Sequence, residues 1–150
     1  MNILGSYLAR LVNCAFSNTT PPDIPSEITF DELFDIAARN HMEYIVFSTL
    51  VKTNLPEEKK EILRNRVKIS MMRTMVQVKE LNIIKSRFEE NGIVNQPMKG
   101  ACMKFIYPNP MMREMSDIDI LVRDEYMSKA QKIFEELDYT SLGREHHHDI

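Results

Sequence analysis

Two aspartates that stand one residue apart, Asp117 and Asp119, are the residues of this sequence best suited to chemistry. They fall in an alternating segment, residues 117–122, that is typical of a β-strand. Side chains two residues apart on a strand point to the same face, so the two carboxylates are expected to project side by side. Adjacent carboxylates repel each other, and a divalent cation between them relieves that repulsion.

A second group of residues, upstream of the aspartates, is suited to binding phosphate. Lys99 and Gly100 stand where a short predicted strand, residues 93–98, turns into a predicted helix, residues 99–107. Such a turn offers backbone N–H groups and a positive charge to a phosphate. A metal site beside a phosphate site predicts phosphoryl or nucleotidyl transfer.

Each candidate also has a plain structural interpretation. An Asp-x-Asp pair on an arbitrary strand often belongs to a solvated face, and Lys99 is equally well explained as a surface lysine. Arg113 could pair with one of the aspartates instead of contacting a substrate. Ser116 could form a local hydrogen bond rather than take part in chemistry. His41, which lies at a junction between two predicted helices, is interpreted as a packed or capping residue.

The first half of the chain is predicted to be helical, because apolar residues recur there at intervals of three and four. The predicted helices cover residues 2–16, 30–38, 41–53 and 56–90. The last of them would be about 50 Å long at ~1.5 Å per residue, more than the width of a compact domain of this size. We therefore expect it to protrude, to bend or to pack against further chain, and its length favours a homodimer interface along residues 56–90.

In the second half of the chain the apolar residues no longer recur only at helical intervals, and short segments alternate as strands do. The predicted elements are strands over residues 93–98 and 117–122, helices over 99–107 and 124–137, and a third strand from Tyr139 onward. This order predicts an α+β fold, in which a helical region over residues 1–91 precedes a small mixed sheet with flanking helices over residues 92–150.

Composition limits the classes of function. The chain of 150 residues carries a formal net charge of −3, whereas a protein that coats nucleic acid needs a basic face. That charge does not exclude a nucleotide bound through a metal. No apolar run approaches the ~20 residues that cross a bilayer, and the N-terminus has no basic signal-peptide region. We expect no membrane association and a cytoplasmic location.

The stretch from Gly92 to Tyr139 resembles the uncharacterised nucleotidyltransferase group of the DNA polymerase β-like superfamily. The residues that carry the resemblance are, in order, Gly92-Ile93, Lys99-Gly100, Tyr107-Pro108, Arg113, Asp117-Ile118-Asp119-Ile120-Leu121-Val122 and Leu137-Asp138-Tyr139. About a third of the chain carries these motifs, and residues 1–91 are similar in helical pattern only.

The resemblance implies a nucleotidyltransferase fold whose carboxylates bind two Mg²⁺ ions. The ions would hold a nucleoside triphosphate and activate a hydroxyl of an unknown acceptor for attack on the α-phosphorus, with release of pyrophosphate. Asp117 and Asp119 correspond to the catalytic metal ligands, and Gly100 corresponds to the glycine where the backbone approaches phosphate. The residues expected to bind the nucleotide are Lys99, Gly100, Arg113 and Ser116.

The sequence also departs from the superfamily pattern. Ala101 follows Gly100 where the wider superfamily has glycine or serine, so a hydroxyl contact to phosphate is missing. Superfamily enzymes usually carry a further carboxylate on a later strand, and only Asp149 is a candidate for it here. The alternative is an inactive or incomplete nucleotidyltransferase fold, truncated at the C-terminus, that acts as a helical interaction module. The three histidines at positions 146–148 would alternate between strand faces and are interpreted as a solvated or substrate-channel segment.

Overall fold

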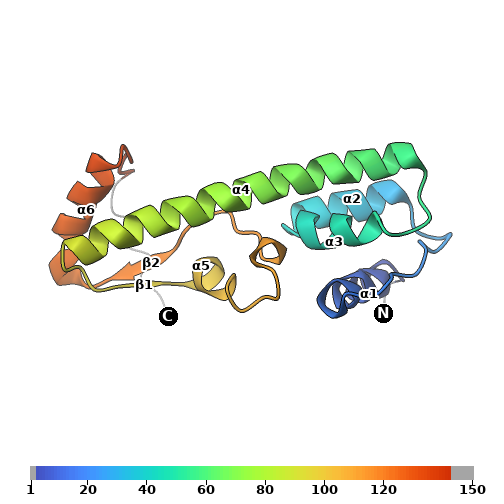
Figure 1. The fold of residues 1–150 in the computed structure, drawn as a ribbon, viewed down its shortest axis with the longest axis horizontal. Coiled ribbons are helices and arrows are strands. Elements are labelled where there is room, and N and C mark those ends of the chain that lie inside the picture. Colours follow the sequence, from blue (N-terminus) through green and yellow to red (C-terminus); the bar gives the residue numbers. More distant parts are fainter. Residues whose placement is uncertain (1–2, 143–150) are drawn as a thin grey trace.

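A single long helix organises the molecule. The computed structural model describes residues 3–142, in which α4 (Glu57–Glu90, 34 residues) runs from one end of the protein to the other (Figure 1). The other helices are α1 (Ile3–Ser17), α2 (Phe30–Arg39), α3 (Glu43–Leu50), α5 (Lys99–Met103) and α6 (Met127–Glu136). The strands are β1 (Asn95–Pro97) and β2 (Ile120–Val122), and two short 3-10 turns are η1 (Pro110–Met112) and η2 (Asp124–Tyr126). The predicted helix over residues 56–90 is thus confirmed.

The first hydrophobic core lies between α4 and the three N-terminal helices. It is centred on α3 and joins buried side chains of all four helices, including Leu11, Leu33, Phe47 and Leu63. The ring of Phe34 stacks on that of Phe47 with 4.9 Å between the centroids. This core therefore fixes α2 and α3 against the N-terminal half of α4.

The second half of α4 belongs to the core of the α/β region. Its buried residues Ile84 and Phe88 pack against Ile93 and against Ala130 and Ile133 of α6. A smaller cluster joins Leu81 of α4 to Ala101 and Met115, beside the sheet. Helix α4 consequently supplies side chains to the cores on both sides of the predicted boundary at residue 91.

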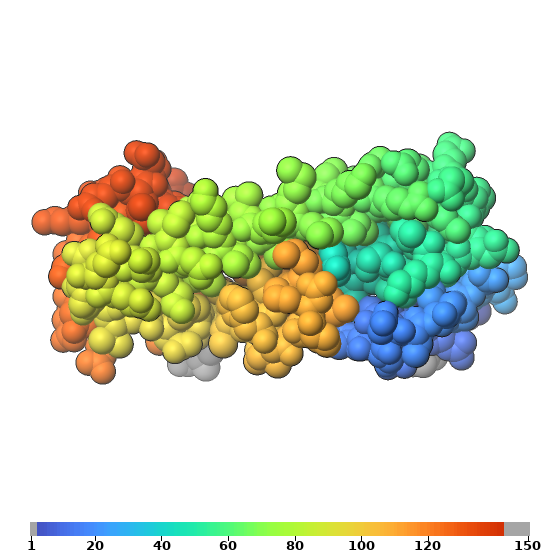
Figure 2. All heavy atoms as spheres, in the orientation of Figure 1, coloured from blue at the N-terminus to red at the C-terminus, as the bar shows by residue number. Residues whose placement is uncertain are grey.

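The segment that connects α5 to β2, residues 104–119, lies between the two regions. In Figure 2 this segment (orange) contacts both the helical region and the sheet region. The ring of Tyr107 lies 5.4 Å from that of Phe16 in α1, and Asn109 donates a hydrogen bond to the hydroxyl of Tyr44 in α3 at 2.9 Å. We call residues 104–119 the connecting segment below.

The α+β class is confirmed, with a sheet that is smaller than predicted. Strands β1 and β2 pair antiparallel in the register Asn95↔Val122, Gln96↔Leu121 and Pro97↔Ile120, so the sheet of residues 3–142 is an antiparallel pair rather than a mixed sheet. Each strand covers three residues, because β2 has only β1 as a partner in the part of the chain that the structure describes, and β1 ends where the chain turns into α5. Residues 139–142 form no strand, and the rest of the predicted third strand lies outside the described residues.

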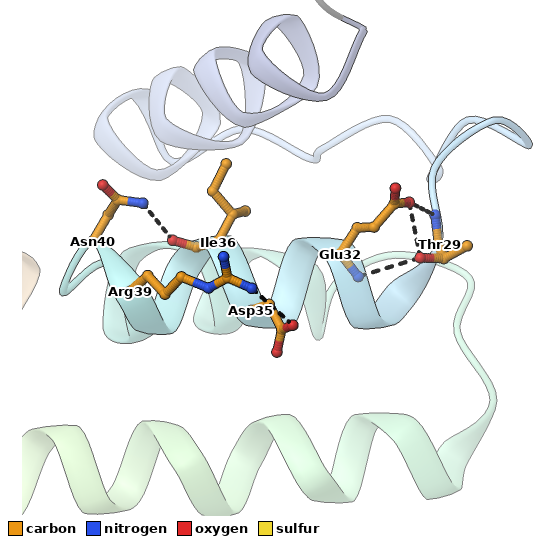
Figure 3. Close-up of polar contacts among 6 residues, drawn as sticks. All are labelled: Thr29, Glu32, Asp35, Ile36, Arg39 and Asn40. Carbon is orange, nitrogen blue, oxygen red and sulfur yellow. Dashed lines mark hydrogen bonds and ion pairs between the residues drawn. The ribbon is translucent and has the colours of Figure 1, made fainter.

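Helix α2 carries hydrogen-bonded caps at both ends (Figure 3). Thr29 and Glu32 form a capping box, in which the Thr29 hydroxyl accepts from the Glu32 N–H at 3.2 Å and the Glu32 carboxylate accepts from the Thr29 N–H at 2.8 Å. At the other end, the side chain of Asn40 donates to the Ile36 carbonyl at 2.8 Å. The C-terminal cap, Asn40, ends α2 and fixes the position of His41, the residue that follows it.

None of the helices within residues 3–142 has both the length and the apolar character needed to cross a membrane.

Candidate functional site

The site residues that the sequence predicts all line one small pocket. Its volume is about 140 Å³, and its lining comprises Lys99, Gly100, Arg113, Ser116, Asp117 and Asp119 together with His41, Glu114 and Met115. The lining comes from the β1–α5 turn, from the connecting segment and from the corner between α2 and α3. Two larger hollows, of about 370 and 540 Å³, contain neither aspartate.

The two aspartates occupy different backbone environments. Asp117 lies in a bend, and its carboxylate accepts a hydrogen bond from the Ser116 hydroxyl at 3.2 Å. Asp119 immediately precedes β2, and its carbonyl accepts from the Met98 N–H at 2.9 Å, which extends the strand pairing by one step. The prediction that both aspartates lie within the strand is therefore wrong, because the pairing partner ends before Asp117 is reached. Both nevertheless line the same pocket.

Lys99 already pairs with one of the carboxylates. Its Nζ lies 3.3 Å from Oδ1 of Asp119, and the two side chains are 71% and 32% exposed. An ion pair this exposed contributes at most about 1 kcal/mol. The pair can therefore open readily, so that Asp119 can accept a cation and Lys99 can turn to an anion.

Gly100 is required by close packing. It is buried, and a Cβ atom on it would lie 2.9 Å from Cβ of Met115 in the connecting segment. The left-handed backbone conformation at this turn belongs to the preceding residue, Lys99, with φ of 45°. The glycine thus allows α5 to approach the segment that carries Asp117.

Arg113 is held by the backbone beside the pocket. Its guanidinium donates a hydrogen bond to the carbonyl of Glu114. The sequence left open that Arg113 pairs with an aspartate instead of a substrate. Within the described part of the chain it forms no ion pair with Asp117 or Asp119. Because a guanidinium carries five N–H donors, Arg113 retains donors for a ligand.

Glu114 is a site residue that sequence reasoning missed. Its side chain is buried, at 4% exposure, and its Oε1 accepts a hydrogen bond from the backbone N–H of Tyr44 at 2.5 Å. Tyr44 lies in the first turn of α3, where the backbone N–H groups lack partners within the helix and the helix dipole favours a negative charge. This bond ties the helical region to the pocket. No local signal could reveal it, since the two residues are far apart in the sequence.

Lys104, one turn after the phosphate-binding candidates, is an unusual buried cation. It has no measurable exposure, and its Nζ has no hydrogen-bond partner in the described structure. Burial lowers the pKa of its ammonium group, the charge of Arg113 lowers it further, and the charge of Glu114 raises it. The folded state therefore disfavours the charged form of Lys104.

We expect Lys104→Met to stabilise the protein at pH 7 by about 1 kcal/mol, because folding no longer buries an unpartnered charge. The gain should shrink as pH rises toward the ordinary lysine pKa of 10.5. Between the lowered folded pKa and that value the unfolded chain binds more protons, so the stability of the wild type rises with pH. Urea unfolding of both proteins from pH 7 to pH 10 measures this change. A difference that is constant over the range would contradict the assignment.

The donor atoms of the pocket fit Mg²⁺ better than a softer metal. Within residues 3–142, no three His, Cys, Asp or Glu side chains converge so as to hold a metal ion by themselves. Asp117 and Asp119 would supply two carboxylates, and Mg²⁺ is typically held by one or two carboxylates together with substrate phosphates and water. Asp149 and the histidines at positions 146–148 lie outside the described residues.

Comparison with known proteins identifies a family for this chain. The chain matches the family described as uncharacterised nucleotidyltransferase over residues 26–150. The matched region contains every residue that lines the pocket, including His41 from the helical region. No curated protein and no solved structure matches the chain. Since the match covers most of its length, the chain belongs to the uncharacterised nucleotidyltransferase family.

Proposed function

We propose that this protein transfers a nucleoside monophosphate from a nucleoside triphosphate to a hydroxyl group of an acceptor, in a reaction that depends on Mg²⁺. The observation that supports the proposal is the pocket in which Asp117 and Asp119 lie together with Lys99 and Arg113. Membership of the nucleotidyltransferase family supports the general kind of reaction.

In this proposal the pocket residues divide into two roles. Asp117 and Asp119 would hold Mg²⁺, and the ion would supply positive charge to stabilise the attacking and leaving oxygens. Lys99 leaves Asp119 and binds the triphosphate, and Arg113 offers its remaining N–H donors to the same group. The acceptor oxygen forms a bond to the α-phosphorus, the bond to the pyrophosphate oxygen breaks, and the proton of the acceptor hydroxyl is released.

The experiment that tests the proposal is calorimetric titration of the protein with ATP, GTP, CTP and UTP, each with and without Mg²⁺. We expect at least one of the four to bind, and to bind only when Mg²⁺ is present. Absence of binding for all four would contradict the proposal and favour the interaction module described next.

A second function, as a self-associating helical module, is supported by the uncovered face of α4. Figure 2 shows α4 (green) uncovered along one edge of the molecule. Exposed apolar side chains on this helix include Ile62, Ile69, Met72 and Val76. Their spacing of seven, three and four residues fits a and d positions of a coiled-coil seam, with the polar Asn65 at the remaining d position, and such a seam is complementary to a copy of itself. We propose a second copy of this chain as its partner.

We expect Met72→Glu to shift the protein from dimer to monomer in sedimentation velocity, because it places a charge in the middle of the seam. Met103→Glu is the matched control, since Met103 is also an exposed methionine but lies at the end of α5. The control should leave the dimer intact. A wild-type protein that is monomeric at all concentrations would exclude this second function.

A further inference from the structure

Among the described residues of the helical region, His41 alone lines the candidate active site. It lies at the corner between α2 and α3, and it shares the pocket with Lys99, Arg113 and the paired aspartates. Its interpretation as a packed or capping residue is therefore incomplete, because His41 is exposed and lines the pocket rather than being buried in a core.

The backbone at His41 has a conformation that normally selects a different residue. The His41 N–H bonds to the Ala38 carbonyl at 3.3 Å, and the Met42 N–H bonds to the Ala37 carbonyl at 2.9 Å. This pair of bonds is a Schellman motif, with His41 at the left-handed position and φ of 52°. Glycine is usual at that position because it has no Cβ. Histidine tolerates this conformation better than most residues that have a Cβ, but helix termination does not itself require an imidazole there.

The corner that carries His41 is fixed relative to the pocket. Three residues further on, the N–H of Tyr44 donates to the buried carboxylate of Glu114, which also lines the pocket. On the other side, the preceding residue, Asn40, caps the C-terminus of α2 by donating to the Ile36 carbonyl (Figure 3). The backbone at His41 is thus fixed beside the pocket by contacts on both flanks, as a binding residue requires.

The neighbours of His41 indicate what it binds. In the described residues no three potential ligand side chains converge on a metal position, so the imidazole does not complete a metal site with Asp117 and Asp119. Its cationic neighbours in the pocket are Lys99 and Arg113. An N–H donor beside a lysine and an arginine is suited to a phosphate group. We propose that His41 donates a hydrogen bond to the phosphates of the nucleotide, so that the helical region forms part of the active site. This inference rests on the proposed function.

The test uses a substitution that suits the backbone. His41→Gly removes the imidazole and places the usual residue at the left-handed position. We expect its Kd for inorganic tripolyphosphate and for ATP, both with Mg²⁺, to rise about tenfold, equivalent to about 1.4 kcal/mol. We expect its Tm to be unchanged or raised. The matched control is Asn18→Gly, since Asn18 has a left-handed φ of 50° outside the pocket. That control should bind both ligands as the wild type does.

A second variant, His41→Asn, guards against an effect of the glycine itself, because asparagine tolerates the left-handed conformation. Loss of affinity for both ligands in both variants, at unchanged Tm, supports the inference. Wild-type affinity in the variants overturns the inference. A loss of affinity accompanied by a lower Tm also overturns it, because unfolding then explains the loss. Weaker binding of ATP alone assigns His41 to the nucleoside and also overturns it. A wild-type protein that binds neither ligand contradicts the proposed function itself.

Discussion

The double substitution Asp117→Asn with Asp119→Asn is expected to abolish the binding of nucleotide that depends on Mg²⁺. Asparagine keeps the size of each side chain but removes both negative charges, and a hard cation prefers charged oxygen ligands. We expect the Kd for the Mg²⁺–nucleotide complex to rise at least about 100-fold, equivalent to about 2.8 kcal/mol. Calorimetric titration of both proteins at the same Mg²⁺ concentration measures the change.

The stability of this double variant separates a functional from a structural effect. Asp117 is exposed, and the one ion pair of Asp119 within residues 3–142 is with an exposed lysine, so the free energy of unfolding should change by no more than about 0.5 kcal/mol. Asp124→Asn with Asp138→Asn is the matched control, because both aspartates are exposed and neither lines the pocket. If the control loses affinity as well, or if the Asp117/Asp119 variant binds like the wild type, the metal site is not at these carboxylates.

The second large effect is expected at Gly100. Gly100→Ala would place a Cβ 2.9 Å from Cβ of Met115, and neither atom can move without its backbone. Overpacking of this kind should reduce the free energy of unfolding by about 2 kcal/mol. Because Met115 lies two residues before Asp117, the shift should also weaken Mg²⁺–nucleotide binding. Urea unfolding and calorimetry measure the two effects.

Gly5→Ala is the control for Gly100→Ala, and we expect it to raise the free energy of unfolding rather than lower it. Gly5 lies within α1, and a Cβ on it would have no neighbour within 4 Å. Alanine is preferred to glycine inside a helix by about 0.5–1 kcal/mol, so this variant should be more stable than the wild type. Equal stability of the two alanine variants would show that the close approach at Gly100 imposes no constraint.

Helices and the paired aspartates could be predicted from the sequence because their signals are local. The helix over residues 56–90 has an uninterrupted three-and-four repeat, and the structure places it at Glu57–Glu90. The spacing of Asp117 and Asp119, with Lys99 and Gly100 upstream, predicts a shared site. All four of these residues lie in one pocket. Their assignment to metal and phosphate stays a prediction.

Features that depend on distant partners could not be predicted. The extent of β2 depends on where its partner β1 ends, so the strand begins at Ile120 rather than at Asp117. Glu114 gains its role only from Tyr44, and His41 reaches the pocket only because the helical region packs against the connecting segment. The spacing of two aspartates, or the spacing of apolar residues along a helix, carries no information about such contacts between distant parts of the chain.

The position of α4 has a consequence for how the protein unfolds. Its N-terminal half contributes Leu63 to the helical core, and its C-terminal half contributes Ile84 and Phe88 to the other core. Neither core can open without exposing apolar side chains of the same continuous helix. The two regions are therefore expected to melt as one cooperative unit, and the amide protons in the middle of α4 should exchange with solvent only when the whole chain unfolds.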